Sequence, residues 1–354
     1  MFLTDIVLIA IALSLSSGVS ARLLNVRQPA PYLIGGVTAA SFIIIVMCFR
    51  SLDFGVDTVT YAGIFTDFCK GGLIEDRESS FQIATDALNF AMLGSCDTNF
   101  LPAAWIFLIV LPVLFFRAPW RVRLCYLSAF LLSLIGIELS TNALRQGLSV
   151  GLMVLGISLA PVTLLFTLLF GVFSMVFHTS AGLVLLGYLL ARQNWKVFLS
   201  LMTGLILLTL HFLHSSIELP FVSRFLYEIN KYTMHESSEL WIRILSFSCV
   251  VAALLAPLLF RRNGAKIGDI LSDKSYVVAL RLAIICTPFL TLPYFGYRFI
   301  YGMYPVILFL TLSPSLTPYT KSGSQFIALS AMNVFILLAW AAGSTYMREL
   351  PFFS

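Results

Sequence analysis

Long apolar runs without charged residues recur along this chain, and they constrain its fold more than any other feature. The stretch from Leu101 to Phe116 is one such run, and similar stretches follow at intervals. Only 11% of the residues are charged, against about 25% in a soluble globular protein. Inside a bilayer, only helices and closed barrels satisfy the backbone hydrogen bonds. Because the runs are continuous and not alternating, the sequence predicts an all-α polytopic membrane protein, with residues 1–354 as a single transmembrane domain.

Twelve apolar runs have the composition of transmembrane helices. The first run lacks the basic segment that begins a signal peptide, so we interpret it as a permanent span. The run at 180–191 is short for a hydrocarbon core about 30 Å thick, which suggests a thinned membrane there. The predicted spans are 3–21, 32–49, 100–116, 124–139, 142–160, 163–177, 180–191, 197–213, 241–260, 276–292, 298–312 and 325–344.

Basic residues indicate the side of the membrane on which each predicted loop lies. Short loops rich in Lys and Arg face the cytoplasm, and the bases after spans one, three, seven, nine and eleven share one side. Most acidic residues then fall on the other side, with Asp269 and Asp273 as exceptions. Both termini and two long loops, about 50–99 and 214–240, are predicted to face outward. The bases are Arg22, Arg27, Arg117, Arg121, Arg123, Arg192, Lys196, Arg261, Arg262, Lys266, Lys274 and Lys321.

The two long outer loops are expected to be partly helical. Apolar residues recur at helical spacing within 79–95, which predicts an amphipathic helix on the membrane surface. Cys69 and Cys96 share this loop, and we predict a disulfide between them because compartments outside the cytoplasm are oxidising. The six cysteines show neither CxxC nor Cys/His ligand spacing, so the sequence predicts no metal site.

Arg145 stands near the outer end of the predicted span 142–160, where a charged residue is costly and usually functional. Ser140 or Thr141 is expected to cap this helix, and its N-terminal N–H groups favour anions. The arginine adds a planar fork of donors that matches a phosphate. The alternative is an interfacial anchor, in which Arg145 snorkels outward and pairs with Glu138. If the helix is continuous, its polar stripe comprises Glu138, Thr141, Asn142 and Arg145.

His178 lies between two short predicted spans, on the outward side. Histidine is the usual general base near neutral pH, although it is also an ordinary turn residue at a helix end. Asp57 and Tyr61 lie just outside the second predicted span and are one turn apart if that segment is helical. The alternative for Asp57 is a solvated loop carboxylate.

Arg298 begins the predicted span 298–312, again on the outward side. Tyr297, Tyr301 and Tyr304 share one face of this helix by their spacing. The alternative is an aromatic belt with an interfacial arginine, which accounts for the tyrosines better than for the arginine.

These polar groups all fall on one face of the membrane, although the orientation was assigned mainly from other residues. The sequence therefore predicts an outward-facing cavity that contains two cations, a histidine, a carboxylate and tyrosines. Two arginines and a helix N-terminus suit a phosphate or diphosphate. Tyrosines and amides suit sugars, and the surrounding lipid suits a long-chain carrier.

Four short motifs carry a family resemblance that covers about residues 50–310. They are D-x-x-x-Y at 57–61, LRQGLSVGL at 144–152, FHTSA at 177–181 and YR-x-x-Y at 297–301. In this order they resemble the Wzy-type polysaccharide repeat-unit polymerases, most closely the EpsG-like branch. The resemblance implies a metal-independent glycosyltransferase of the GT-C type without a cofactor. It also implies that the protein lies in the bacterial inner membrane with its active site facing the periplasm.

The implied reaction joins oligosaccharide repeat units carried on undecaprenyl diphosphate, as in O-antigen synthesis. Arg145 and Arg298, with Arg224 as a third candidate, would neutralise the departing diphosphate. His178 or Asp57 would take the proton of the acceptor hydroxyl. Membrane lipids and a chain-length regulator are the other partners that the family implies; no nucleic acid is expected. The predicted substrate-binding residues are Glu138, Asn142, Gln146, Tyr61, Arg224, Tyr297 and Tyr301.

Other functions remain open from the sequence. A flippase for lipid-linked oligosaccharides would also have many spans, but transporters usually carry ionisable residues near the membrane centre and inverted repeats. O-antigen ligase has closely related chemistry with lipid A–core as acceptor. A membrane acyltransferase usually has a different pattern of polar residues.

Overall fold

The computed structural model is all-helical in the part of the chain that it describes. Within that part the only pairing of extended backbone is an isolated bridge between Arg261 and Thr320. The predicted span at 3–21 and nearly all of the loop at 214–240 lie outside the described residues. The described residues are 56–71, 79–141, 143–161, 163–214, 237–290, 295–320 and 322–343, with scattered positions between 41 and 48.

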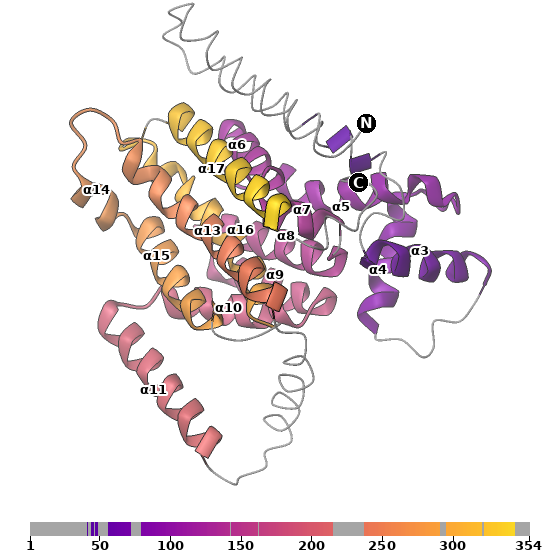
Figure 1. The fold of residues 1–354 in the computed structure, drawn as a ribbon, viewed down its shortest axis with the longest axis horizontal. Helices are drawn as coiled ribbons and strands as arrows, with labels where there is room; N and C mark the ends of the chain where they lie inside the picture. The colour runs from indigo at the N-terminus through magenta and orange to yellow at the C-terminus, as the bar shows by residue number, and fades with distance from the viewer. Residues whose placement is uncertain are drawn as a thin grey trace, which may run out of the picture.

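Helices occupy every predicted span from residue 100 onward (Figure 1), so the predicted all-α fold is confirmed for this part of the chain. The predicted span 180–191 coincides with α10. The α-helices are α3 (Val56–Cys69), α4 (Ser79–Ala91), α5 (Leu101–Leu114), α6 (Trp120–Leu131), α7 (Leu134–Thr141), α8 (Leu144–Leu159), α9 (Leu164–Phe177), α10 (Ser180–Ala191), α11 (Trp195–His214), α13 (Ser237–Leu259), α14 (Ile267–Ser272), α15 (Lys274–Cys286), α16 (Phe295–Thr311) and α17 (Ser322–Gly343). Short 3-10 turns are η1 (Thr98–Phe100), η2 (Thr287–Leu290) and η3 (Pro314–Leu316).

The count of twelve spans is not confirmed. Among the described residues, Ile242–Leu259 in α13 is long and apolar enough to cross a bilayer, and α6 with α7 would be a second span if the bent pair counts as one. Helices α8, α9 and α10 are apolar but have 16, 14 and 12 residues. A straight crossing of the hydrocarbon core needs about 20 residues.

The predicted span 124–139 is not a straight helix. Helices α6 and α7 meet at an angle of 81°. The Ser133 hydroxyl donates to the Phe130 carbonyl and accepts from the Gly136 N–H, so it replaces helical backbone bonds at the bend. A Cβ atom at Gly136 would lie 1.8 Å from the Phe130 carbonyl oxygen. Glycine is therefore the residue that allows this close approach of the two helices.

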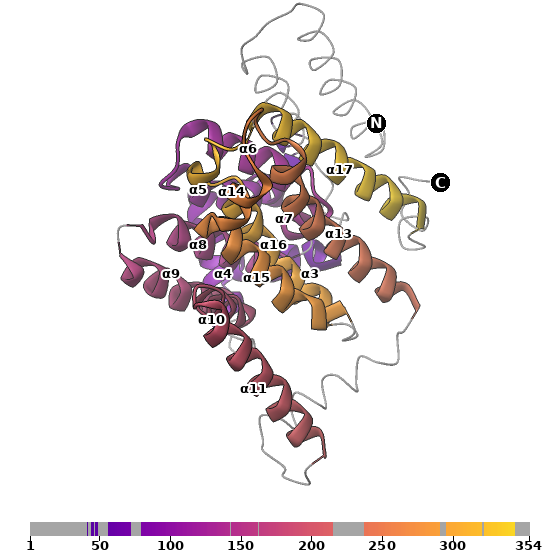
Figure 2. The ribbon, with the colours of Figure 1, turned by 90° about the vertical axis from the view of Figure 1, so that its left-hand side faces the viewer.

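Helices α8 and α9 form an antiparallel hairpin beside α10 and α16 (Figure 2). The Thr167 hydroxyl donates to the Gly156 carbonyl at 3.0 Å, which fixes the register of the hairpin. Helix α16 approaches α10 closely, because a Cβ at Gly302 would lie 2.7 Å from the Val184 side chain. These contacts place the starts of α8, α10 and α16 at the same end of the bundle.

The opposite end of these helices carries the predicted inward loops, and we call it the basic end. The Ser158 hydroxyl near the end of α8 accepts from the Arg117 N–H after α5. The bridge between Arg261 and Thr320 joins the segments that follow α13 and α16. The structure thus joins the segments after α13 and α16 and places the segment after α5 beside the end of α8, as the alternating topology requires.

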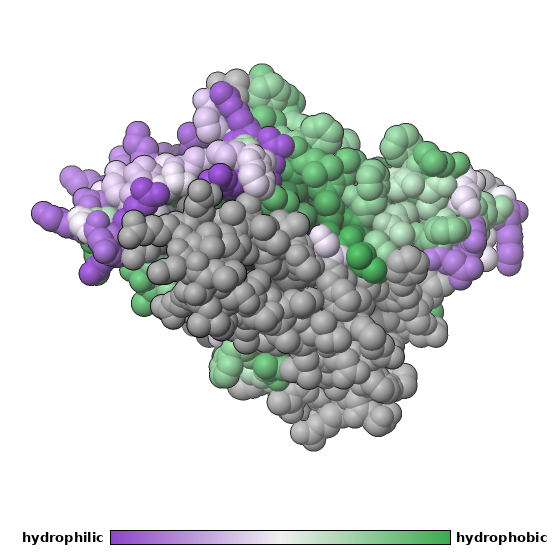
Figure 3. All heavy atoms as spheres, turned by 90° about the horizontal axis from the view of Figure 1, so that it is seen from above, coloured by the Kyte–Doolittle hydropathy of each residue, from purple (hydrophilic) through white to green (hydrophobic). Residues whose placement is uncertain are grey.

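Figure 3 shows how hydropathy is distributed over one face of the molecule. Hydrophilic side chains gather at two opposite ends of this view, at the end that carries α14 and at the end that carries α3 and α4. Among the coloured atoms between these ends, hydrophobic side chains predominate. This arrangement is typical of helical membrane proteins.

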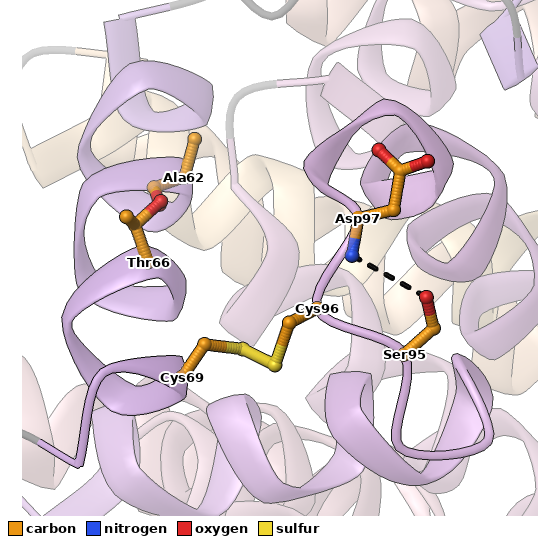
Figure 4. Close-up of a disulfide and its surroundings, with 6 residues drawn as sticks. All are labelled: Ala62, Thr66, Cys69, Ser95, Cys96 and Asp97. Atoms are coloured by element: carbon orange, nitrogen blue, oxygen red, sulfur yellow. Dashed lines mark hydrogen bonds between the residues drawn. A yellow bond between two sulfur atoms is a disulfide. The ribbon is translucent and has the colours of Figure 1, made fainter.

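The first long loop is partly helical, as predicted, through α3 and α4. Helix α4 is amphipathic, but its apolar side packs on α5, α8 and α9, with Ala84 and Leu88 fully buried. The prediction that this face lies on the membrane surface is therefore wrong, because protein covers it. The predicted disulfide is confirmed: Cys69 at the end of α3 is bonded to Cys96 before η1, with 5.9 Å between the Cα atoms (Figure 4).

Candidate functional site

The start of α8 is a break in the helical backbone. Helix α7 ends at Thr141 and α8 begins at Leu144, so the polar stripe predicted for one continuous helix is divided between two helices. The N-cap of α8 is Ala143, which makes no side-chain cap, so the predicted cap by Ser140 or Thr141 is wrong. The Thr141 hydroxyl donates instead to the Ile137 carbonyl in its own helix.

Arg145 lies in the first turn of α8 and contacts α3. Its side chain is half-buried, and its Nε donates to the Tyr61 hydroxyl at 3.0 Å. Tyr61 is held in turn by an edge-to-face contact with Trp105 of α5, with 5.0 Å between the ring centroids. Because Tyr61 and Trp105 are both buried, the arginine has a fixed partner on a neighbouring helix.

Gln146 links α8 to α16. Its side chain is buried, and Nε2 donates to the backbone carbonyl of Arg298 at 2.6 Å. Since Arg145 and Gln146 are consecutive, this bond joins the helix that carries Arg145 to the helix that carries Arg298. The two predicted cation-bearing segments are therefore neighbours in space.

Arg298 and two tyrosines form the part of the site on α16. The Arg298 Nε donates to the Tyr297 hydroxyl at 3.4 Å. The Tyr297 and Tyr301 rings meet edge to face, 5.1 Å apart. Helix α7, which carries Glu138, also packs against α16. We call the set Tyr61, Glu138, Arg145, Gln146, Tyr297, Arg298 and Tyr301 the polar cluster.

His178 lies at the level of Arg145 along the α8–α9 hairpin. The Thr167–Gly156 bond is a shared reference point for the two helices. Arg145 precedes Gly156 by eleven residues on α8 (156 − 145 = 11). His178 follows Thr167 by eleven residues along α9 (178 − 167 = 11). Both helices rise about 1.5 Å per residue, so these residues stand at the same height.

The α10–α16 contact gives a similar height for His178 and Arg298. His178 precedes Val184 by six residues, and Arg298 precedes Gly302 by four, on helices that run the same way. The histidine therefore lies at the same end of the bundle as the polar cluster.

The backbone around His178 fixes the position of its ring. His178 is the C-cap of α9 in an extended conformation. Its Nδ1 lies 2.6 Å from the Ser180 hydroxyl and accepts from the Ser180 N–H at 3.3 Å. Because a backbone N–H can only donate, the neutral ring carries its hydrogen on Nε2 in this arrangement.

The side chains of three predicted site residues lie outside the part of the chain that the structure describes. Asn142 and Arg224 lie outside the described residues. Asp57 is helical, one turn before Tyr61 on α3, and its side chain is not among those described. In the described ranges, no three His, Cys, Asp or Glu side chains form a group that could hold a metal ion.

Two buried arginines, Arg243 and Arg281, were absent from the residues predicted by sequence. Arg243 of α13 is 7% exposed, and its Nη1 donates to the Leu290 carbonyl at 2.8 Å. Arg281 of α15 is 5% exposed and lies over the Trp195 ring, 4.4 Å from its centroid. Both stand in apolar stretches, which is the signal that identified Arg145.

The described part of the chain is all-helical, with apolar helices and a cluster of arginines and tyrosines at one end of them. The model of the EpsG family matches residues 34–353, so the chain belongs to this family of polysaccharide polymerase-like membrane proteins. Comparison with curated proteins and with solved structures gave no match.

Proposed function

We propose that the protein is a bacterial inner-membrane polymerase that joins oligosaccharide repeat units carried on undecaprenyl diphosphate. The observation that carries this proposal is the placement of Arg145 and Arg298, each with a tyrosine partner, on helices that the Gln146–Arg298 bond joins, in a member of the EpsG family. One unit's sugar hydroxyl attacks the anomeric carbon of the growing chain. The new glycosidic bond forms as the bond to the diphosphate breaks, and undecaprenyl diphosphate leaves.

The two arginines neutralise the departing diphosphate in this proposal. Charge builds up on the diphosphate as the glycosidic bond breaks, and preorganised cations stabilise that charge. The Tyr61 hydroxyl accepts from the Nε of Arg145. This bond orients the fork that the terminal nitrogens of Arg145 form. The N–H groups at the start of α8 add to the positive potential, and the N-cap residue Ala143 makes no side-chain hydrogen bond to them.

The sugar units are bound by the tyrosines and amides of the site in this proposal. Tyr297 and Tyr301 offer aromatic faces and hydroxyl groups. Glu138, Gln146 and Asn142 contribute polar groups from the segment around the α7–α8 break, and Arg224 is kept as a further cation. The Cys69–Cys96 disulfide supports the placement of this side of the protein in an oxidising compartment, and the periplasm is such a compartment.

The geometry of His178 favours donation over proton abstraction. With Nδ1 accepting from Ser180, the neutral ring presents a hydrogen on Nε2. This hydrogen suits an oxygen of the diphosphate or of the sugar. Asp57, one turn before Tyr61 on the same face of α3, is then the better candidate for the base that takes the acceptor's proton.

A flippase is the second candidate, and one observation favours it. The sharp α6–α7 bend and the α7–α8 break make a discontinuous helix, which transporters often use at their binding sites. Against it, Arg145, His178 and Arg298 stand at the ends of helices and not midway along them.

The deciding experiment uses the full-length protein in proteoliposomes with purified lipid-linked repeat units. A polymerase converts them to a ladder of longer chains on the same lipid. A ligase gives a ladder only on an added lipid A–core acceptor, and a flippase moves the units between leaflets unchanged. Absence of longer chains from active preparations would contradict the proposed function.

A further inference from the structure

Helix α3 bridges the break between α7 and α8. The Thr58 hydroxyl of α3 donates to the backbone carbonyl of Thr141, the last residue of α7, at 2.6 Å. One turn farther along α3, the Tyr61 hydroxyl accepts from Arg145 in the first turn of α8. Residues three apart share a helix face, so one face of α3 contacts both sides of the break.

The Thr58–Thr141 bond stabilises the break itself. Both residues are buried, with Thr58 0% and Thr141 2% exposed. The last carbonyls of a helix lack an intrahelical donor, and a buried carbonyl without a donor is costly. In a continuous helix, the Thr141 carbonyl would accept from the N–H of Arg145, four residues on. The Thr58 hydroxyl supplies a donor from another helix, so it favours the conformation in which α7 ends at Thr141.

The rest of α3 is attached to its own segment of the chain. It packs on α4 and η1, and Cys69 at its end is bonded to Cys96 (Figure 4). Thr58 and Tyr61, near its start, join this segment to α7 and α8. The position of the Tyr61 hydroxyl relative to Arg145 therefore depends on Thr58 as well.

We propose that Thr58 is a positioning residue of the diphosphate site. This assignment rests on the proposed function. Thr58 acts through Arg145 and does not touch the substrate: it holds α3 against the end of α7, which sets where Tyr61 meets Arg145 and keeps the start of α8 as a helix N-terminus. A cation oriented before the substrate arrives stabilises the departing charge without a cost of reorganisation.

The test measures the joining rate of the full-length protein in proteoliposomes with purified lipid-linked repeat units at saturating concentration. Thr58→Val replaces the hydroxyl with a methyl group, and we expect the rate to fall about tenfold. Thr58→Ser keeps a hydroxyl and should restore the rate to within about twofold of the unaltered protein. Thr58→Ala also removes the hydroxyl without crowding the carbonyl, and it replaces the valine variant if that variant does not fold.

Tyr276→Phe is the matched control for a bond that only stabilises the fold. Tyr276 of α15 is 2% exposed, and its hydroxyl donates to the Leu254 carbonyl of α13 at 3.0 Å. Like Thr58, it is a buried hydroxyl bonded to a carbonyl of another helix, but it lies at the basic end. Thr58→Val and Tyr276→Phe should both lower the melting temperature, and only Thr58→Val should lower the joining rate.

A double-mutant cycle with Arg145→Lys tests whether Thr58 acts through Arg145. Residues of one hydrogen-bonded network are not additive. In the Arg145→Lys background, Thr58→Val should therefore slow joining by less than about twofold, although it should still lower the melting temperature.

The outcomes separate the two proposals. The inference is overturned if the unaltered protein joins repeat units and the variants without the Thr58 hydroxyl join them at the same rate. It is also overturned if Thr58→Val slows joining equally in both backgrounds, because the hydroxyl then serves the fold and not Arg145. If the unaltered protein forms no longer chains at all, the proposed function fails, and the assignment of Thr58 fails with it.

Discussion

The two ends of the helices hold arginine side chains in different ways. At the basic end, Arg281 is 5% exposed, and its partners are backbone carbonyls and an indole ring. At the other end, Arg145 and Arg298 remain half-buried, and their Nε atoms donate to tyrosine hydroxyls. Carbonyls at a helix end are fixed parts of the fold, whereas tyrosines at a partly open position also suit a ligand. The comparison separates arginines that hold the fold from arginines that we assign to function.

The largest expected effect is on stability at the basic end. Arg281→Ala removes charge-assisted bonds to two carbonyls and a cation–π contact, and we expect a loss of about 3–5 kcal/mol. Melting temperature in detergent and protein abundance would report the loss. Arg121→Ala is the control, since Arg121 is exposed at the same end and lies over the Trp120 ring of its own helix. Equal stability of Arg281→Ala and Arg121→Ala would contradict a structural role for Arg281.

The disulfide gives the next largest effect, at the opposite end. Cys69 and Cys96 are 27 residues apart, so the chain-entropy model predicts about 3–4 kcal/mol from the cross-link. The double variant Cys69→Ser, Cys96→Ser should melt earlier than the oxidised protein. Adding a reductant should lower the melting temperature of the unaltered protein and leave the variant unchanged. A protein whose melting does not respond to reductant would show that the bond does not stabilise α3.

Arg145 tests whether the polar cluster acts on turnover. Arg145→Lys keeps the charge but loses the fork, and we expect a loss of roughly ten- to a hundredfold in polymer formation. Arg145→Ala should be worse, at unchanged protein level. Polymer ladders from strains with matched protein amounts measure this, with Arg121→Lys as control. A full-length ladder with Arg145→Ala would mean that this arginine is only an interfacial anchor and that Arg298 holds the diphosphate.

His178 separates hydrogen-bond donation from proton abstraction. If Nε2–H donates, His178→Gln should retain activity within about threefold, because the glutamine amide can also donate, while His178→Ala should lose tenfold or more. If His178 is the general base, both variants should lose activity equally. Initial rates of repeat-unit joining at saturating substrate distinguish these cases.

Tyr61→Phe is expected to give the smallest effect. The change removes the hydroxyl that accepts from Arg145 but keeps the ring against Trp105. One hydrogen bond of this kind is worth about 0.5–1.5 kcal/mol, so the joining rate should fall roughly two- to tenfold. Tyr188→Phe is a useful comparison, since Tyr188 lies toward the basic end of α10. Equal rates for the unaltered protein and Tyr61→Phe would show that Arg145 is oriented by other contacts.

The sequence by itself determined where the helices lie, because hydropathy is a local property of each segment. It placed α10 at 180–191 and gave the other described spans to within a few residues. It also placed Arg145, His178 and Arg298 at one end of the bundle, because the ends of helices alternate once the basic loops are assigned to one side. The pairing of Cys69 with Cys96 followed from their place in one loop.

The tertiary structure decided what these local patterns could not. The bend at Ser133 depends on the close approach of Gly136 to the Phe130 carbonyl, and the protein-covered face of α4 depends on which helices surround it. The bonds from Arg145 to Tyr61 and from Gln146 to the Arg298 carbonyl join residues that are 84 and 152 positions apart. Such contacts are set by the register between packed helices, which comes from the fit of side chains across the whole interface and not from any one segment.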